Sequence, residues 1–211
     1  MSLDMLRASA AQGVECMVAT SHFYATRDRV DRFLEKRRNA WETLRSQMTQ
    51  EMPRVILGAE VAFFRGIGKA DRMDELKIEG TDSMLLEMPF REWTQEDVDE
   101  VTTLIRERGF GIILAHLDRY IVMRENAGYV RQLMEMPLTV QINAEALMDW
   151  RQRSRLVKLF KSGQAHLLGS DCHNMGHRSP NLAQGREVLR KKLGQGCLDE
   201  TDRLCERLLL G

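Results

Sequence analysis

The feature that most constrains the fold of this sequence is an alternation of short apolar runs with longer segments of helical periodicity. Strands are expected at 15–20, 54–57, 84–86, 112–115, 138–142 and 165–168. Helices are expected at 3–12, 26–49, 95–108, 127–134, 151–161, 181–193 and 198–210. Strands that alternate with helices predict an α/β protein with a mostly parallel sheet. Both an open doubly wound sheet and a barrel fit this order.

Charge and hydropathy exclude several classes of protein. The 31 basic residues balance the 31 acidic residues, so the formal net charge is zero, which argues against broad nucleic-acid or membrane binding. No apolar run approaches the roughly 20 residues that cross a bilayer, and the first residues lack the pattern of a secretory signal. We therefore expect one cytoplasmic domain over residues 1–211, without membrane insertion. The sparse cysteines predict reduced thiols.

Polar side chains with metal-binding chemistry follow the apolar runs. They are His22, Glu60, Glu87, His116, and the pair Asp171 and His173. In a parallel sheet or barrel the carboxyl ends of all strands lie on one face, so we expect these side chains to converge. Imidazole mixed with carboxylate suits Mn, Fe or Zn, and several carboxylates suit more than one ion.

Taken singly, each of these residues is better explained as a cap or a loop residue, and only the joint pattern favours a metal site. His166 lies inside an apolar run and is interpreted as a structural strand residue, whereas His177 receives no assignment. Arg119 and Arg178 follow His116 and His173 closely. Because guanidinium matches phosphate oxygens bidentately, these two arginines make phosphate a reasonable substrate.

A second interpretation of the last segment is a cysteine-dependent phosphatase. Cys172 and Arg178 have C-x5-R spacing, the skeleton of a loop in which a thiolate attacks phosphorus and the arginine binds the oxygens. Such a loop needs small residues to curl around phosphate, and here His173, Asn174 and Met175 occupy its start. This interpretation also leaves the other candidate metal ligands unexplained.

With these residues collected, the chain resembles the polymerase and histidinol phosphatase (PHP) superfamily. Within it, the chain is most similar to bacterial manganese-dependent protein-tyrosine phosphatases of capsule and exopolysaccharide operons. The resemblance runs nearly end to end and rests on Val18-Ala19-Thr20-Ser21-His22, Leu57-Gly58-Ala59-Glu60-Val61, Leu85-Leu86-Glu87-Met88-Pro89-Phe90, Leu114-Ala115-His116, Gln141-Ile142-Asn143-Ala144 and Gly169-Ser170-Asp171-Cys172-His173-Asn174.

The resemblance implies a fold, a cofactor and a reaction. The fold is a distorted, TIM-like seven-stranded β/α barrel, and the reaction is hydrolysis of phosphotyrosine in proteins, with a bacterial tyrosine autokinase as a candidate substrate. The cofactor is Mn²⁺, with Fe, Zn or Mg as alternatives, and the complete family site holds two or three ions. Arg119 and Arg178 match arginines implicated in phosphate binding and catalysis, and Glu60 matches a carboxylate that bridges two ions. The implied ligands are His22, Glu60, Glu87, His116, Asp171 and His173.

The sequence also departs from the family pattern. Family members begin with a strand that carries Asp-x-His-x-His and a loop with a further Asp, and this sequence starts after that region. We therefore expect three ligands and the first barrel strand to be missing, with lower stability or homo-oligomerisation through the resulting gap. The family usually has Pro at the positions of Ser21 and Leu117, and Glu at the position of Asp118. We expect these replacements to change the geometry of the loops more than the binding of metal.

Three alternatives to a phosphotyrosine phosphatase stay open at this point. One is another PHP enzyme, such as a histidinol-phosphate phosphatase. Another is a non-catalytic member that has lost ligands and has a binding role. The third is the Cys172 thiolate phosphatase.

Overall fold

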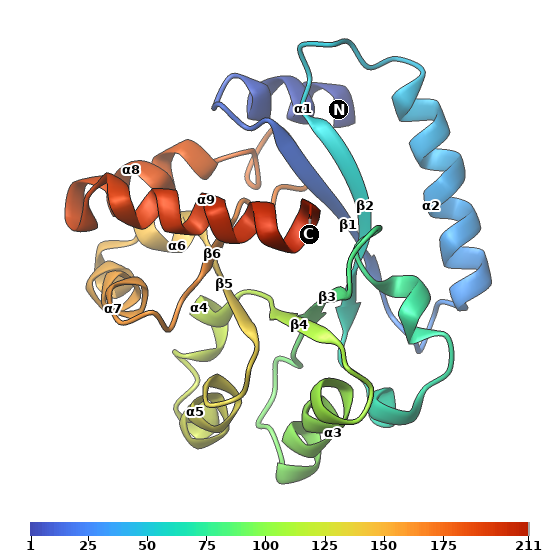
Figure 1. The fold of residues 1–211 in the computed structure, drawn as a ribbon, viewed down its shortest axis with the longest axis vertical. Helices are drawn as coiled ribbons and strands as arrows, with labels where there is room; N and C mark the ends of the chain where they lie inside the picture. The colour runs from blue at the N-terminus through green and yellow to red at the C-terminus, as the bar shows by residue number, and fades with distance from the viewer. Residues whose placement is uncertain (211) are drawn as a thin grey trace.

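A six-stranded parallel sheet with the order β1-β2-β3-β4-β5-β6 forms the centre of the molecule, as described by a computed structural model for residues 1–210. The strands are β1 (Cys16–Phe23), β2 (Arg54–Ala62), β3 (Ser83–Glu87), β4 (Gly111–Leu114), β5 (Thr139–Asn143) and β6 (Leu167–Gly169). The sheet curls into a half-barrel with most of the helices around its outer face (Figure 1). The predicted α/β class and the parallel sheet are confirmed, and the curl favours the barrel over the flat open sheet.

The first helix precedes the sheet and the last two follow it, while the other helices lie in the connections between successive parallel strands. The helices are α1 (Ser2–Ala10), α2 (Val30–Arg45), α3 (Gln95–Arg106), α4 (Leu117–Tyr120), α5 (Ala127–Met134), α6 (Ala144–Met148), α7 (Trp150–Lys161), α8 (Leu182–Leu193) and α9 (Gln195–Leu210). Short 3₁₀ turns are η1 (Ile67–Lys69), η2 (Met73–Leu76) and η3 (Arg124–Asn126). The sequence did not predict α4 or α6. No helix within residues 1–210 is both long and apolar enough to cross a membrane.

Three strands are longer than predicted, and the difference concerns the candidate ligands, because β3 also extends to include Glu87 as its last residue. The sequence placed the ends of the first two strands at residues 20 and 57, but β1 reaches Phe23 and β2 reaches Ala62. The parallel register continues through the polar segment, where His22 pairs with Glu60. His22, Glu60 and Glu87 therefore project from strands, and the expectation that these three residues follow the strands is wrong.

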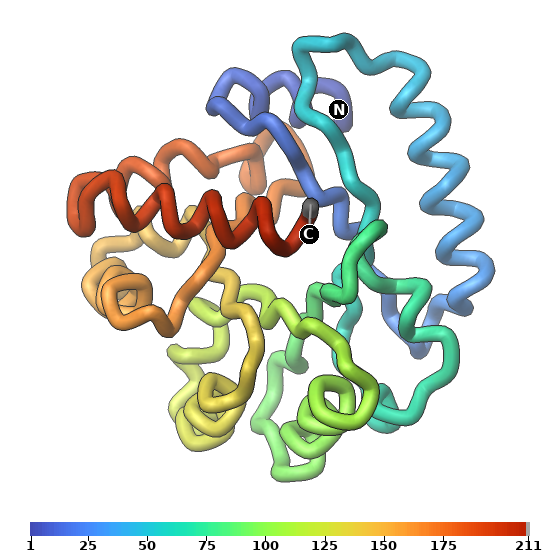
Figure 2. The backbone as a smooth tube through the Cα atoms, in the orientation of Figure 1, coloured from blue at the N-terminus to red at the C-terminus, as the bar shows by residue number. Residues whose placement is uncertain are grey.

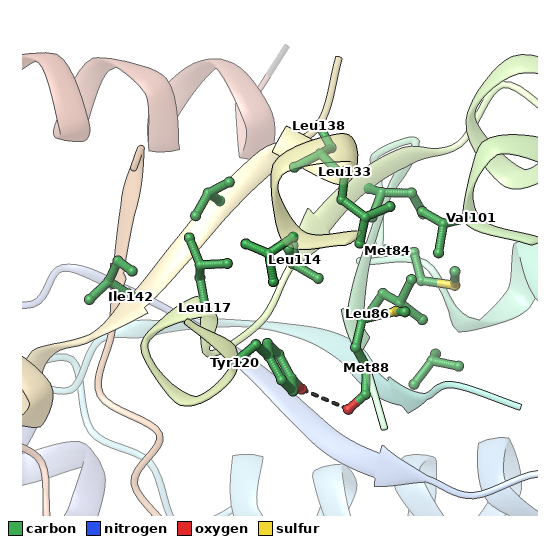
Figure 3. Close-up of a cluster of buried hydrophobic side chains, with 14 of the residues drawn as sticks. Met84, Leu86, Met88, Val101, Leu114, Leu117, Tyr120, Leu133, Leu138 and Ile142 are labelled. Atoms are coloured by element: carbon green, nitrogen blue, oxygen red, sulfur yellow. Dashed lines mark hydrogen bonds between the residues drawn. The ribbon is translucent and has the colours of Figure 1, made fainter. Parts of the chain in front are cut away.

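The main hydrophobic core lies between the sheet and the outer helices. Figure 3 shows Leu86 of β3 and Leu114 of β4 packed with side chains from the helical layer, among them Leu117 and Tyr120. All four side chains are fully buried. The Tyr120 hydroxyl donates a hydrogen bond to the carbonyl of Met88 (2.7 Å), so its polar group is satisfied inside the core. This packing fixes the segments that follow β3 and β4.

The concave side of the sheet has a smaller apolar cluster of its own. Ile78, Ile113 and Leu167 form its buried part, and Leu204 and Leu208 of α9 pack against them. A cavity of about 800 Å³ extends along this side, and its lining includes both the end of α9 and the polar candidate residues. The C-terminal helix therefore partly fills the interior of the half-barrel.

The segment after α1 lies next to the start of α8, although the two are far apart in the sequence (Figure 2). The Gln12 side chain donates to the carbonyl of Pro180 (2.8 Å) and accepts from the amide of Ala183 (3.0 Å). Within residues 1–210, β1 pairs only with β2, and β6 pairs only with β5. The half-barrel therefore keeps two free strand edges.

Candidate metal centre

Five of the candidate ligands converge near the carboxyl ends of the strands. His22, Glu60 and Glu87 are supplied by β1, β2 and β3, while His116 and Asp171 follow β4 and β6. Glu60 is central, because its Oε1 atom lies 2.9 Å from His116 Nε2 and 3.5 Å from His22 Nε2. Ligands from the two edge strands of the sheet, His22 of β1 and Asp171 after β6, therefore meet in one cluster.

The ligand atoms form two overlapping groups. His22, Glu60 and Glu87 make one group, and Glu60, His116 and Asp171 make the other, with the ligand atoms of each group within 4.8 Å of one another. Glu60 belongs to both groups, which is the arrangement of a carboxylate that bridges two cations. The imidazole and carboxylate donors fit a transition-metal ion, and fit Zn or Mn better than Ca.

His173, the sixth candidate, lies beside the cluster but belongs to neither group. Its ring centroid is 5.1 Å from that of His22, and its Nδ1 atom is 3.0 Å from the backbone carbonyl of Asp171. About a third of its side chain is exposed. The position leaves His173 at the open side of the site.

The charges of the cluster call for a cation. Burial, and then the neighbouring charge of Glu60, raise the pKa of Glu87 above its ordinary value. The pKa of Asp171 is lowered, because burial, which would raise it, is outweighed by the hydrogen bond from Arg178 and by the charges of His116 and Arg119. Three carboxylates thus share a largely buried space, and a divalent ion would offset their mutual repulsion.

His116 is held by a network of hydrogen bonds. Its backbone amide donates to the Gln141 side chain (2.9 Å), and its Nδ1 atom lies 3.0 Å from Asn143 Oδ1. Burial lowers the pKa of this imidazole, but the hydrogen bond and charge of Glu60, with the charge of Asp171, raise it overall. The Asp118 carboxylate in turn accepts the amide of Asn143 (2.8 Å). These contacts fix the ring with Nε2 toward Glu60.

Two of the ligands have left-handed backbone conformations. His116 has φ 53° and Asp171 has φ 48°, in a region that only a few per cent of non-glycine residues adopt, with Asn, Asp and His enriched among them. Each of these conformations occurs two residues after the end of a short strand. Backbone strain of this kind is concentrated at functional sites, and it persists only where the surroundings hold it.

Two arginines flank the cluster on its accessible side. Arg119 pairs with Asp171 Oδ2, and Arg178 pairs with Asp171 Oδ1. Each side chain is about one third exposed. A guanidinium group has five N–H donors, so both arginines keep donors for an anion while they hold Asp171.

The Cys172 loop does not have the geometry of a thiolate phosphatase. The amides of His173 and Asn174 both donate to the carbonyl of Arg178 (2.8 and 3.2 Å), so they point into the loop. In the thiolate mechanism such amides bind the phosphate oxygens. The Arg178 guanidinium is also paired with Asp171. The loop supports the candidate metal ligands instead.

Some site residues could not be identified as functional from the sequence. Gln141 and Asn143 are polar residues two positions apart in a buried strand, which is the signal that both face the same side. Asp118 appeared only as a departure from a family pattern, yet it is buried and orients Asn143. His166 lies just before β6 and accepts the amide of Val140 (2.9 Å), which agrees with a structural role. His177 is exposed.

Known proteins share both the sequence pattern and the fold. The family model described as "Capsular polysaccharide synthesis, CpsB/CapC" matches residues 1–204. The tyrosine-protein phosphatase CpsB of Streptococcus pneumoniae is 24% identical over 210 residues, with 92% of this chain and 83% of that protein covered. The tyrosine-protein phosphatase YwqE of Bacillus subtilis is 23% identical over 207 residues, with 92% and 77% covered.

A solved structure has the same fold. It comes from a crystallographic study of YwqE from Bacillus subtilis and CpsB from Streptococcus pneumoniae, which are described there as metal-dependent tyrosine phosphatases. The TM-score is 0.83 at 22% identity, over 99% of this chain and 85% of the other. Because the family model extends over nearly the whole sequence, this chain belongs to the CpsB/CapC family of capsular polysaccharide synthesis proteins.

Proposed function

We propose that this chain is a metal-dependent phosphatase that hydrolyses phosphotyrosine in proteins. The observation that carries the proposal is the meeting of His22, Glu60, Glu87, His116 and Asp171 next to Arg119 and Arg178. Family membership and relatives named tyrosine-protein phosphatases support the same reaction.

The protein groups divide into two sets with different tasks. The metal-binding set would consist of His22, Glu60, Glu87, His116, Asp171 and His173. Divalent ions held there would supply charge neutralisation on the phosphoryl oxygens and an activated water. Arg119 and Arg178 would bind the phosphoryl oxygens, where their charge opposes the negative charge that develops during transfer.

The cofactor and the substrate are narrower parts of the proposal. Mn²⁺ is the proposed ion, since the donors are mixed imidazole and carboxylate, with Fe, Zn and Mg as the alternatives to compare. The phosphate ester of tyrosine leaves as a phenolate, a weaker base than an alkoxide, so a strong general acid is not required. A bacterial tyrosine autokinase in capsule biosynthesis is the proposed protein substrate.

The decisive experiment combines metal analysis with turnover. Protein prepared without chelator is assayed for metal content, and hydrolysis of a phosphotyrosine peptide is compared with hydrolysis of histidinol phosphate at graded Mn²⁺. We expect Mn²⁺-dependent turnover of the peptide, inactivation by chelator, and loss of both metal and turnover in Glu60→Gln. Cys172→Ser is the matched control in the same segment, and it should keep its activity.

Other outcomes would favour the competing functions. Faster turnover of histidinol phosphate would identify a different phosphatase of the same superfamily. Metal binding without turnover of any phosphoester would indicate a binding protein. Loss of activity in Cys172→Ser with indifference to chelator would support the thiolate route.

A further inference from the structure

Phe90 is an exposed aromatic side chain close to the candidate metal centre. It follows β3 and lies three residues after Glu87, and 55% of its surface is exposed. The neighbouring apolar residues Met88 and Trp93 differ from it, because they are almost completely buried. A large apolar side chain that stays exposed beside a polar cluster is a candidate for ligand contact.

The Phe90 ring rests on a rigid support. It stacks on Tyr120 with 5.4 Å between ring centroids, and Trp93 packs on the same tyrosine at 5.2 Å. The Tyr120 hydroxyl is fixed by the Met88 carbonyl, and the Trp93 indole donates to the Pro89 carbonyl (2.9 Å). A ring supported in this way loses little conformational freedom when a ligand binds against it.

Arg119 connects this ring with the anion-binding side of the cluster. Its guanidinium carbon lies 5.9 Å from the Phe90 ring centroid, and the same guanidinium pairs with Asp171. A phosphate bound by Arg119 therefore has its ester group within reach of Phe90.

Tyr24 is a second aromatic residue at the cluster, and its ring already contacts other side chains. It is parallel to the His22 ring at 5.6 Å, while the Arg27 guanidinium lies 4.1 Å from its centroid. Phe90 instead contacts Tyr120 and remains more than half exposed. Of these two rings, Phe90 is the one with room for a substrate ring.

We propose that Phe90 forms the surface on which the aromatic ring of an aryl phosphate stacks, and that it makes the site selective for aryl over alkyl phosphates. This inference rests on the proposed phosphatase function and assigns a specificity residue to it. Offset stacking of two rings contributes more than the burial of their area alone, so loss of the Phe90 ring weakens aryl ligands selectively.

Binding of two non-hydrolysable probes separates the ring contribution from that of the phosphoryl group. Phenylphosphonate and methylphosphonate are titrated into the Mn²⁺-loaded protein by calorimetry. We expect wild type to bind phenylphosphonate more tightly, and Phe90→Ala to weaken it by about three- to tenfold while methylphosphonate binding stays the same. Phe90→Tyr keeps a ring and should keep the preference, and Phe90→Leu should lose it.

Val122→Ala is the matched control, because Val122 is a similarly exposed apolar residue that lies just after α4. It should leave both affinities unchanged. Equal weakening of both probes in Phe90→Ala, or an unchanged preference, would overturn the inference, as would wild type that binds the two probes equally. Wild type that shows the phenyl preference but hydrolyses no phosphoester would contradict the proposed function and leave the ring contact supported.

Discussion

Asn143 joins the segments that follow β4 and β6 at the candidate site. Its Oδ1 atom faces His116 Nδ1, and its Nδ2 atom lies 3.4 Å from Asp171 Oδ2. One amide thus orients an imidazole that follows β4 and a carboxylate that follows β6. The sequence indicated both ligands because His and Asp are unusual after apolar runs. It gave no role to Asn143, whose partners are decided only by the curl of the sheet.

The first prediction concerns Asn143→Ala, which should weaken Mn²⁺ binding about 10- to 100-fold, the usual effect of losing a residue that orients ligands. Isothermal titration of the metal-free protein measures the affinity. Asn39→Ala on the exposed side of α2 is the control and should bind as wild type does. Unchanged affinity in Asn143→Ala would mean that the ligands hold their positions without it.

The second prediction concerns a buried carboxylate that belongs to neither group of candidate ligands. Asp97 is fully buried, caps α3 together with Thr94, and pairs with Arg91 (2.6 Å). The hydrogen bond from Arg91 lowers the pKa of Asp97, with burial opposing it and the amide of Thr94 assisting. Its contribution to stability is therefore complete above the ordinary carboxyl pKa and disappears as the pH falls through the lowered value.

Asp97→Asn should lower the free energy of unfolding by about 1 to 3 kcal/mol at pH 7, and the difference from wild type should shrink toward pH 3. Urea denaturation at a series of pH values measures this difference. Asp82→Asn provides the comparison, because Asp82 is an exposed partner of Lys77 and should change stability by at most about 0.5 kcal/mol. If the stability difference between Asp97→Asn and wild type did not change with pH, the ion pair of Asp97 with Arg91 would not be its cause.

Among the secondary-structure elements, the helices of two or more turns were predicted best, because the helical repeat of apolar residues can be recognised in them. Helix α5 was predicted at its observed limits, and the core of α3 was predicted to within its last turn. Helices α4 and α6 have only 4 and 5 residues, too few for a 3.6-residue repeat to be seen. The ends of β1 and β2 were missed because polar site residues continue the strands.

Helix α8 packs directly against α6, and a glycine permits the contact. A Cβ atom at Gly185 would lie 2.7 Å from Ala144 Cβ and 2.8 Å from Ala144 Cα. The side chain of Asn143, at the start of α6, belongs to the site, so this contact also supports the ligands.

The third prediction is that Gly185→Val lowers the free energy of unfolding by about 1 to 3 kcal/mol or more, since backbone must move to accept it. Gly128→Ala is the control, because a Cβ atom there meets nothing within 4 Å and the helix α5 should gain about 0.5 to 1 kcal/mol. Thermal denaturation of both variants checks the pair. Equal melting temperatures for Gly185→Val and wild type would contradict the tight α6–α8 contact.

The whole molecule is a half-barrel rather than a closed barrel. Within residues 1–210, β1 and β6 each keep one strand edge without a partner strand. Free edges offer unpaired N–H and C=O groups to another chain. Apolar patterning could predict the parallel sheet but not its curvature, which depends on the twist and packing of all strands together.

The fourth prediction is therefore concentration-dependent self-association. Light scattering after size-exclusion chromatography should give a mass above 24.4 kDa that rises with protein concentration. Ser21→Lys places a charge at the exposed position of β1 and should reduce the association. A constant monomer mass at every concentration would contradict the prediction.

The cluster takes its ligands from β1, β2 and β3 and from the segments after β4 and β6, so partial folding cannot assemble it. Occupancy by an ion is then thermodynamically linked to global folding, because the unfolded chain offers no comparable binding site. At an ion concentration 100-fold above the dissociation constant, the linkage amounts to about 2.7 kcal/mol. The concentration of this ion in the cell would thus influence how fast the protein is degraded by proteases, in addition to any effect on catalysis.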